Sequence, residues 1–542
     1  MNFGGTWTPE NRTEIESNIP NFKAKGLNLY CGSFVSSVEN ENRFLLLEGQ
    51  LFDSTIQQAI LEPSRLETAY GYYGYVWYDK TTEEIRIGTD RFGFFPIYYA
   101  FENDVFIFGS SINFVKDRLK YRSPDYEAWE EIFVLGEVIG EKSTVKQIKR
   151  LSEGTQIQIK DGKVSFRRYW QPEIPEPVDE ATYIRENNKL LDEAMSLTAN
   201  QTRPKIVLLS GGEDSRRIAL ASVRQGLDAD FFTQETVFKS KYTHWVDADV
   251  KLSVKLSDML KRPHFIESLP NNSQFFEDWK ARDSVLGFEC VAHEWLWPLV
   301  RRITTPSLIY DGIVGDITIN GHYFKHHPQA IDGYKDIDAL AHMIYDGQNA
   351  AWVRKLRTKT ETPLVERVKQ LLNSYPDNPH RLNFYYIFNH TRRKISCASQ
   401  FFALQNHWIC YPYLYYPLFF QSLSLDPRLQ LKKYHQRECM AALSPEIISV
   451  PTTRETPLPS EWLIPRDHEK MEQLDFLYRH LMINDEVLDI FPNYRARYRA
   501  LDAYRKLTDC ISSKAINWPL RRYGWFFEPL SRYSSFLEWL KN

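Results

Sequence analysis

The chain has 542 residues, of which 43% are hydrophobic and 25% charged, and its formal net charge is −3. A chain of this length and composition is large enough for more than one hydrophobic core, so we expect a soluble protein of at least two domains. The small net charge gives no electrostatic reason to expect nucleic acid or an anionic membrane as a partner. No run of about 18 apolar residues occurs, which excludes a predicted transmembrane helix.

The cysteines point to a reducing compartment. The six cysteines are far apart and contain no Cys-x-x-Cys pair, so the sequence predicts neither a zinc site nor a disulfide framework. The first ten residues have no basic region and no apolar segment of the kind that targets a chain for secretion. We therefore expect a cytoplasmic location.

From Arg43 to Ser110 the pattern predicts successive strands separated by turns. We expect strands at 44–49, 70–78, 85–89, 97–101 and 105–108. The string Asp90-Arg-Phe-Gly-Phe-Phe-Pro-Ile-Tyr-Tyr99, followed by Phe-Ile-Phe-Gly-Ser-Ser111, resembles the N-terminal glutaminase domain of class II, glutamine-hydrolysing asparagine synthetases. The resemblance implies an Ntn-hydrolase-like β-sandwich domain over residues 1–172.

Several residues depart from that family's glutaminase site. The family uses an N-terminal cysteine, exposed by removal of Met1, as nucleophile and its α-amine as base, whereas position 2 here is Asn2. Cys31 falls within a predicted strand and has no free α-amine. The family's Asn-Gly-Glu string is replaced by Glu48-Gly49-Gln50, and its acidic Gly-Ser-Asp segment is missing from residues 53–67. We expect this domain to keep its fold as a lid or scaffold without hydrolysing glutamine.

An apolar run at 205–209 ends in Ser210-Gly-Gly-Glu-Asp-Ser215 and predicts a strand, a phosphate loop and a helix. The loop has no lysine, so it is not of the Walker type. An aspartate in a pyrophosphate cradle suits Mg²⁺, because that ion binds one or two carboxylates together with phosphate oxygens. The string resembles the pyrophosphatase loop of enzymes that split ATP into AMP and pyrophosphate. The alternative is a glycine-rich turn with no ligand.

The pattern after this loop alternates helices and strands. A helix over 215–225, a strand over 229–233 and a helix from Asp247 followed by another strand predict a doubly wound parallel sheet, with its ligand at the carboxyl ends of the strands. We expect this α/β ATP-pyrophosphatase synthetase domain over 173–464. The resemblance implies that the backbone of Leu208 to Ser210 and of Phe232 holds the adenosine. It also implies that the remaining ATP and pyrophosphate contacts come from Leu209, Gly211, Gly212, Asp214, Ser215 and Gly312.

A second apolar run, 307–310, ends in Asp311-Gly-Ile-Val-Gly-Asp316. It stands where the family has Ser-Gly-x-Gly-x-Asp-Glu, and the resemblance implies that Asp316 is the second magnesium carboxylate beside Asp214. Asp311 is the weaker candidate, since an aspartate at this position commonly caps a turn. Two such loops are also common in α/β domains that bind no nucleotide.

The remaining predicted site residues are two arginines and the positions where the family has groups that take up the proton of the amine. The stretch 383–399 resembles the family's substrate-facing helix, and we expect Arg392 to be catalytic, with a solvated basic helix face as the alternative. Arg454 stands where the family has a lysine; it stabilises charge but carries no proton. Ile313 and Trp408 occupy positions where the family has groups that assist the reaction, so the general base stays unassigned.

We predict an ATP-dependent, AMP-forming amide-bond synthetase that uses ATP and Mg²⁺ and lacks glutaminase activity, resembling β-lactam synthetases and lasso-peptide cyclases. Its substrates would be a small-molecule or peptide carboxylate and an amine or ammonia. The alternative is a nucleotide-binding pseudoenzyme that serves as a scaffold subunit of a biosynthetic complex. We expect residues 465–542 to form a helical extension that packs on the synthetase domain or on a partner protein; a homodimer and a biosynthetic partner are both open.

Overall fold

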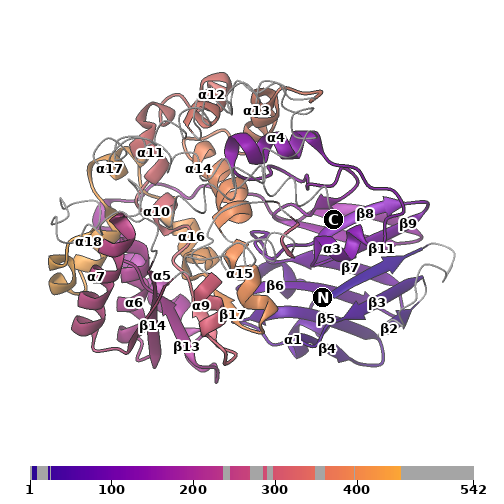
Figure 1. Cartoon of the computed structure of the whole chain (residues 1–542), viewed down its shortest axis with the longest axis horizontal. Coiled ribbons are helices and arrows are strands. Elements are labelled where there is room, and N and C mark those ends of the chain that lie inside the picture. Colours follow the sequence, from indigo (N-terminus) through magenta and orange to yellow (C-terminus); the bar gives the residue numbers. More distant parts are fainter. Residues whose placement is uncertain are drawn as a thin grey trace, which may run out of the picture.

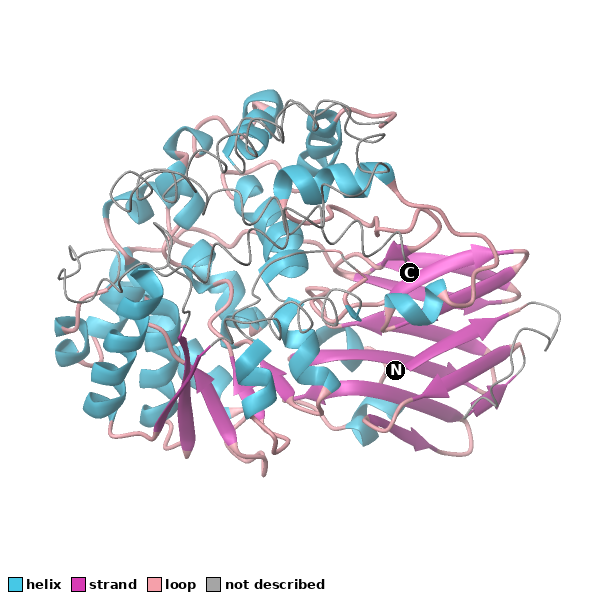
Figure 2. Cartoon of the chain, in the orientation of Figure 1, coloured by secondary structure: helices cyan, strands magenta, loops and turns pink. Residues whose placement is uncertain are grey.

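The structure is a computed structural model that describes residues 3–8, 22–24, 26–235, 244–268, 285–287, 289, 297–347, 360–395 and 397–452. A strand-rich body and a helix-rich body lie side by side in it (Figures 1 and 2). Arg454 and the predicted extension over 465–542 lie outside the described residues. Within those described ranges, no helix is long and apolar enough to cross a membrane.

The N-terminal part contains two six-stranded antiparallel sheets. Their strand orders are β10-β8-β9-β1-β3-β2 and β12-β11-β7-β6-β5-β4. The strands are β1 (Phe3–Trp7), β2 (Phe22–Ala24), β3 (Leu27–Cys31), β4 (Val35–Glu39), β5 (Arg43–Leu51), β6 (Gly71–Asp79), β7 (Glu84–Thr89), β8 (Tyr98–Glu102), β9 (Val105–Gly109), β10 (Lys149–Arg150), β11 (Thr155–Lys160) and β12 (Lys163–Arg168). Apolar side chains from both sheets share one core, so the expected sandwich is present.

Short helices cover the outer faces of this sandwich. Helices α1 (Ile56–Leu61) and α2 (Arg65–Thr68) pack against Tyr73, Tyr75 and Trp77 of the second sheet, and α3 (Ile112–Lys116) packs against the first. Strand β6 is therefore buried on both faces. This double burial explains why its sequence, Gly-Tyr-Tyr-Gly-Tyr-Val-Trp-Tyr-Asp, shows no alternation of apolar and polar residues.

The second part is built on a five-stranded parallel sheet. Its order is β15-β14-β13-β16-β17. The strands are β13 (Lys205–Leu208), β14 (Ala229–Glu235), β15 (His264–Ser268), β16 (Leu308–Tyr310) and β17 (Trp408–Cys410). The chain moves outward from β13 to β15, then returns to add β16 and β17 on the other side. The doubly wound sheet is thus present, with its topological switch point between β13 and β16.

Helices surround this sheet and fill the space above it (Figure 2). They are α5 (Glu180–Ser196), α6 (Glu213–Arg224), α7 (His244–Leu260), α9 (Trp297–Arg302), α10 (Gly315–Thr318), α11 (His322–His326), η2 (Pro328–Ala330), α12 (Ile337–Gly347), α13 (Leu364–Ser374), α14 (Arg381–Tyr385), the π-helix η4 (Tyr386–Ile395), α15 (Cys397–Leu404), η5 (Pro412–Leu414), α16 (Tyr416–Ser422), α17 (Pro427–Lys432), α18 (His435–Ala441) and η6 (Pro445–Ser449). Helix α4 (Tyr126–Leu135) belongs to the N-terminal part and lies beside α13 (Figure 1). Helix α6 starts two residues earlier than predicted, with Gly212 as its N-cap. Asp214 therefore lies in the first helical turn, where the helix dipole favours a negative charge.

The two parts are joined through buried charged groups. Arg367 of α13 bonds to the carboxylates of Glu130 and Glu131 of α4, and its side chain is almost fully buried. The Glu131 side chain is fully buried and also receives the Lys142 ammonium at 2.9 Å. Ion pairs of this kind hold the N-terminal sandwich against the helical part.

Replacing Arg367 by alanine should destabilise the protein strongly, because Glu131 would lose a buried cationic partner. We expect a loss of about 3–5 kcal/mol in apparent unfolding free energy, measured by urea denaturation. Arg428→Ala, which removes an exposed pair with Asp332, is the matched control and should cost about 0–1 kcal/mol. Equal effects of the two substitutions would show that the buried pair does not stabilise the junction.

Candidate functional site

The two loops singled out in the sequence meet at the switch point of the parallel sheet. One follows β13 and the other follows β16, and these strands are direct neighbours in parallel register. Their carboxyl ends therefore lie at the same edge of the sheet, which is where open α/β sheets bind ligands. The N-terminus of the twelve-residue helix α6 opens at this edge, directly after Gly212.

The first loop is held by hydrogen bonds of its own. Ser210 donates its N–H to Ser215 Oγ at 3.0 Å, and the two serine hydroxyls lie 2.9 Å apart. Gly212 donates its N–H to Ser210 Oγ at 3.1 Å, and Gly211 donates its N–H to Asp249 Oδ1 at 2.9 Å. The loop is thus a compact turn whose backbone donors point at nearby oxygen acceptors.

Asp214 is positioned by groups far away in the sequence. Gln436 of α18 donates from Nε2 to Asp214 Oδ1 at 2.7 Å, and the Tyr413 hydroxyl donates to the Asp214 carbonyl at 3.0 Å. Asn320 in turn accepts the Gln436 N–H at 3.0 Å and donates to Glu213 Oε2 at 2.8 Å. These contacts hold the carboxylate of Asp214 at the edge shared by the two loops.

The second loop packs directly on the first. A Cβ atom at Gly312 would lie 3.1 Å from Ser215 N and 3.2 Å from Asp214 Cβ, and one at Gly315 would lie 2.9 Å from Asp214 Oδ1. A side chain at Gly315 would displace the Gln436, Tyr413 and Asp214 side chains, and one at Gly312 would be tightly packed against Asp214 and Ser215. Val314, between the two glycines, has a φ of 82°. This left-handed backbone conformation is strained for a β-branched residue, and strain of this kind gathers at functional loops.

Asp316 follows Gly315, so the structure brings the loops of both predicted magnesium carboxylates together. The Asp316 side chain is 31% exposed, and its Oδ2 lies 3.7 Å from Nδ1 of His322. Within the described ranges, no cluster of three or more His, Cys, Asp or Glu side chains could hold a metal ion. Two carboxylates still fit Mg²⁺, because this ion keeps several waters and completes its shell with phosphate oxygens. We expect Asp214 and Asp316 to hold it together with a bound nucleotide.

Some of the backbone groups predicted to contact the adenosine are hydrogen-bonded within the sheet. Leu209 donates its N–H to the carbonyl of Phe232 at 2.8 Å, and Thr233 Oγ1 donates to the Leu209 carbonyl at 2.6 Å. These bonds extend the pairing of β13 with β14 by one residue. The Leu209 N–H is therefore already paired in this conformation.

Arg392 does not lie on an open basic helix face. It is 1% exposed, and its guanidinium lies 3.2 Å from Glu153 Oε2 of the N-terminal part. Arg393 is also 1% exposed and pairs with Glu289 Oε2 at 3.1 Å. The alternative of a solvated basic face is therefore wrong for Arg392, and the neighbouring Arg393 is buried as well. The structure does not support the predicted catalytic role of Arg392, because its buried guanidinium is paired with Glu153 at the junction of the two parts.

Arg216 ties the phosphate loop to the end of the described chain. Its Nη2 donates to the Gly211 carbonyl at 3.0 Å and to the Pro451 carbonyl at 2.9 Å. The chain is thereby fixed beside the loop at Pro451. Arg454, the predicted charge-stabilising residue, lies outside the described residues, so its role stays a prediction.

Two residues of this site had no signal in the sequence. Asp249 lies in α7, and burial raises the pKa of its carboxyl to about 7 although the Gly211 N–H partly opposes the shift. Gln436 lies in α18 and reaches Asp214 across more than two hundred residues. Only the spatial arrangement of the helices connects them with the loop. Asp311, predicted as a turn cap, is held near N–H groups of Gly312 and Ile313, and burial raises its pKa to about 7 as well.

Comparison with known proteins supports the class of the N-terminal part. Residues 61–170 match the family described as glutamine amidotransferase domain. A putative glutamine-hydrolysing asparagine synthetase 2 of Methanocaldococcus jannaschii is 28% identical over 179 residues, which cover 32% of this chain and 35% of that protein. The chain thus spans about a third of the length of this relative. The matches support a relationship to Ntn-type amidotransferases and asparagine synthetases.

Two solved structures share little sequence with this chain. A glutamine phosphoribosylpyrophosphate amidotransferase from B. subtilis is 10% identical, covers 60% of this chain and 71% of its own, and has a TM-score of 0.19. An NMN synthetase from Francisella tularensis is 13% identical, covers 39% of this chain and 93% of its own, and also has a TM-score of 0.19. Scores this low carry no structural argument.

Asp249→Asn should change how stability depends on pH. A carboxyl whose folded-state pKa is raised to about 7 stabilises the fold fully below its ordinary pKa and loses that contribution as pH rises through 7. The unfolding free energy of the wild type should therefore fall relative to Asp249→Asn between about pH 4 and pH 7, by on the order of 2–4 kcal/mol. Urea denaturation across this range measures the difference. Asp332→Asn, at an exposed surface position, is the charge-matched control, and a pH-independent difference for Asp249→Asn would contradict the assignment.

Proposed function

We propose that the chain is an ATP-dependent, AMP-forming amide-bond synthetase that adenylates a substrate carboxylate and transfers the acyl group to an amine. The observation that carries the proposal is the meeting of the Ser210–Ser215 and Asp311–Asp316 loops at the switch point, with Gly315 against the Asp214 carboxylate. The amidotransferase-domain match and the asparagine synthetase relative support the ligase class. Adenylation and the β-lactam synthetase-like or cyclase-like subclass are the finer parts of the proposal.

The residues of the site suit the first half of this reaction. The α6 N-terminus presents a positive dipole end to phosphate oxygens, and Arg216 holds the loop that surrounds them. Mg²⁺ held by Asp214 and Asp316 would neutralise negative charge on the pyrophosphate leaving group. Fixing the carboxylate of the acid in line with the α-phosphate then supplies most of the rate increase through orientation. Tyr413 and Gln436 keep the Asp214 side of the site from moving as ATP binds.

The second half of the reaction has fewer groups to support it. Ile313, at the proton-removing position, is an apolar side chain that is 8% exposed. Arg392 and Arg393 are committed to Glu153 and Glu289. These observations favour the second candidate function, a nucleotide-binding scaffold subunit, over a synthetase whose amine must lose its proton at Ile313. A synthetase whose amine substrate is already neutral needs no proton acceptor at Ile313, so it is consistent with both halves of the reaction.

The N-terminal part supports the proposal that glutamine is not hydrolysed. Strand β1 pairs with β3, which places Cys31 opposite Phe3. Burial and the negative charge of Glu48 raise the pKa of the Cys31 thiol to about 11. A thiol with such a pKa stays neutral at physiological pH and is a poor nucleophile. Ser110 meanwhile donates its hydroxyl to Glu48 at 2.8 Å, so the polar groups of this region satisfy one another.

Pyrophosphate exchange into ATP tests the synthetase. We expect exchange with at least one carboxylate from a panel of amino acids, β-amino acids and peptides. Asp214→Ala should abolish it, and Asp316→Asn should lower it by at least about a hundredfold, because each removes a charge that stabilises the leaving pyrophosphate. Asp332→Asn is the surface control and should leave the rate unchanged. ATP binding without exchange for any acid would favour the scaffold.

A glutaminase assay tests the N-terminal part separately. We expect no release of glutamate from glutamine by the wild type, with or without ATP, and no change on Cys31→Ser. The neutral thiol described above is the physical reason. Glutamate release that Cys31→Ser removes would reveal a relocated nucleophile and would refute this part of the proposal.

A further inference from the structure

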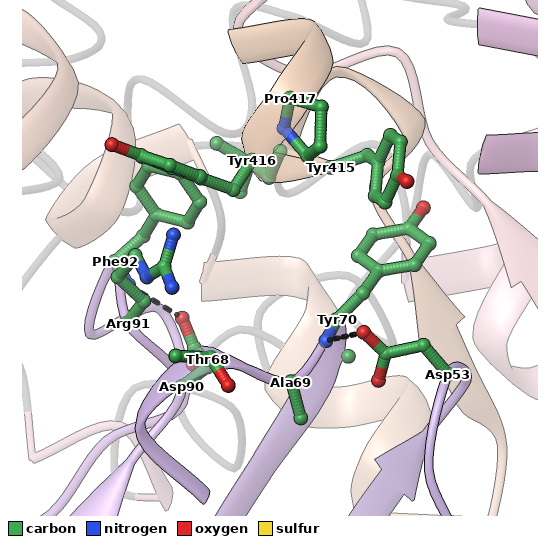
Figure 3. Close-up of a pocket in the computed structure, with 12 residues that line it drawn as sticks. Asp53, Thr68, Ala69, Tyr70, Asp90, Arg91, Phe92, Tyr415, Tyr416 and Pro417 are labelled. Atoms are coloured by element: carbon green, nitrogen blue, oxygen red, sulfur yellow. Dashed lines mark hydrogen bonds between the residues drawn. The ribbon is translucent and has the colours of Figure 1, made fainter. Parts of the chain in front are cut away.

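A cavity of about 190 Å³ lies between the two parts of the chain, and neither the Ser210–Ser215 loop nor the Asp311–Asp316 loop lines it. Its walls come from Asp53, residues 68–71 and residues 90–92 of the sandwich, and from residues 414–417 of the helical part. Figure 3 shows the Arg91 guanidinium on one side, Asp53 and Tyr70 on the opposite side, and Tyr415 to Pro417 above them. The cavity volume is sufficient for a small organic molecule.

Arg91 offers this cavity an unused donor. Its guanidinium carbon lies 3.9 Å from the centre of the Tyr416 ring, and its Nε donates to the Glu67 carbonyl at 3.4 Å. The Nη1 nitrogen is buried and has no hydrogen-bond partner in the described part of the chain. The guanidinium belongs to a side chain that lines the cavity, and its donors other than Nη1 are the ones that a ligand acceptor there would meet. The planar guanidinium fork suits a carboxylate.

Asp53 places an acidic group on the opposite side. Its Oδ2 accepts the Tyr70 N–H at 3.0 Å, and a carboxylate has further acceptor capacity beyond this one bond. Burial raises the pKa of Asp53, although hydrogen bonds to its carboxylate and the charge of Arg65 oppose the shift. An ammonium group beside it would favour its charged form.

The remaining walls combine aromatic and apolar side chains with Thr68 and Asp90. The rings of Tyr70 and Tyr415 pack edge to face at 5.2 Å. The Asp90 carboxyl accepts the N–H groups of Phe92, Phe94 and Phe95, so its oxygens are already hydrogen-bonded to the chain. The opposite charges at the two sides and the apolar surface between them match a molecule with two charged ends and a small body. We propose that this cavity binds an α-amino acid, with the ligand carboxylate on Arg91 and the ligand ammonium on Asp53.

The same segment also contacts the candidate nucleotide site. Tyr413 donates its hydroxyl to the Asp214 carbonyl at 3.0 Å, and the next residue, Leu414, lines the cavity. A ligand that orders residues 414–417 thus acts one peptide bond away from a group that positions Asp214. We infer that amino-acid binding and nucleotide binding are coupled, and coupling between two ligands is reciprocal by thermodynamic necessity.

The binding experiment uses the full chain without nucleotide, so its outcome is independent of the proposed synthetase activity. Isothermal titration calorimetry with each common L-α-amino acid should give a dissociation constant below about 1 mM for the best ligand. The amine and the carboxylic acid that share its side chain should bind at least about tenfold more weakly, because each lacks one charge-assisted interaction. Arg91→Gln and Asp53→Asn should have the same effect.

Arg185→Gln, an exposed charge change on α5, is the matched control and should bind like the wild type. Arg91→Lys keeps the positive charge but loses the planar guanidinium. It should remain folded and bind with intermediate affinity. Thermal melting checks that each variant is folded. No binding by any amino acid at concentrations on the order of 10 mM, or equal binding by Arg91→Gln, would overturn the site and leave a water-filled cavity.

A second arm adds ATP together with the bound amino acid. Incorporation of the amino acid into an amide product identifies it as the amine substrate, whereas a changed ATP affinity without incorporation identifies a regulatory ligand. A changed ATP affinity supports the coupling, and loss of that change in Arg91→Gln assigns it to this cavity. Amino-acid binding with unchanged ATP affinity and no incorporation would overturn the coupling.

Discussion

The close approach of two loops at one edge of the parallel sheet is the constraint on which the candidate site depends. Because Gly315 has no side chain, its backbone comes within reach of the Asp214 carboxylate, and a Cβ there would lie 2.9 Å from Oδ1. Strand order sets this meeting, since only at the switch point do two neighbouring strands send their following segments to opposite faces and leave a crevice between them. Gln436 and Tyr413 then keep Asp214 in place from the far side.

The junction between the two parts of the chain is a second constraint. Arg392 and Arg393 are buried there against Glu153 and Glu289, and burial lowers the pKa of Arg393 to about 10 despite its carboxylate partner. A shift in this direction means that desolvation of the cation is substantial. Separating Arg392 from Glu153 of the sandwich would leave an uncompensated buried charge, and Arg393 donates across the same junction to the carbonyls of Gly140 and Lys142. The helical part therefore depends on the sandwich for hydrogen-bond and ion-pair partners of its buried cations. This dependence gives the sandwich a structural role that requires no glutaminase chemistry.

Local pattern predicts the elements well and their long-range partners poorly. The apolar runs before Ser210 and Asp311 mark two parallel strands and the loops after them, since a buried strand followed by glycine and aspartate is a short-range signal. Strand β6 is predicted despite having no alternation, because turn residues bound it. Burial of Arg392 could not be predicted, since its partner Glu153 belongs to another domain. Asp249 and Gln436 escape prediction for the same reason: their helices reach the loop only after the sheet has formed.

Asp249 fixes the conformation of the Ser210–Ser215 loop and also places a titratable group beside it. Its carboxylate accepts the Gly211 N–H, and a phosphate loop normally offers such a donor to an anion. Burial already raises the pKa of this carboxyl to about 7. A polyphosphate bound beside it would raise the pKa further, because a neighbouring negative charge disfavours ionisation. Nucleotide binding would then be accompanied by proton uptake at Asp249, and its affinity would fall as pH rises above 7. In the proposed nucleotide complex, the carboxyl that accepts the Gly211 N–H would therefore make binding depend on pH.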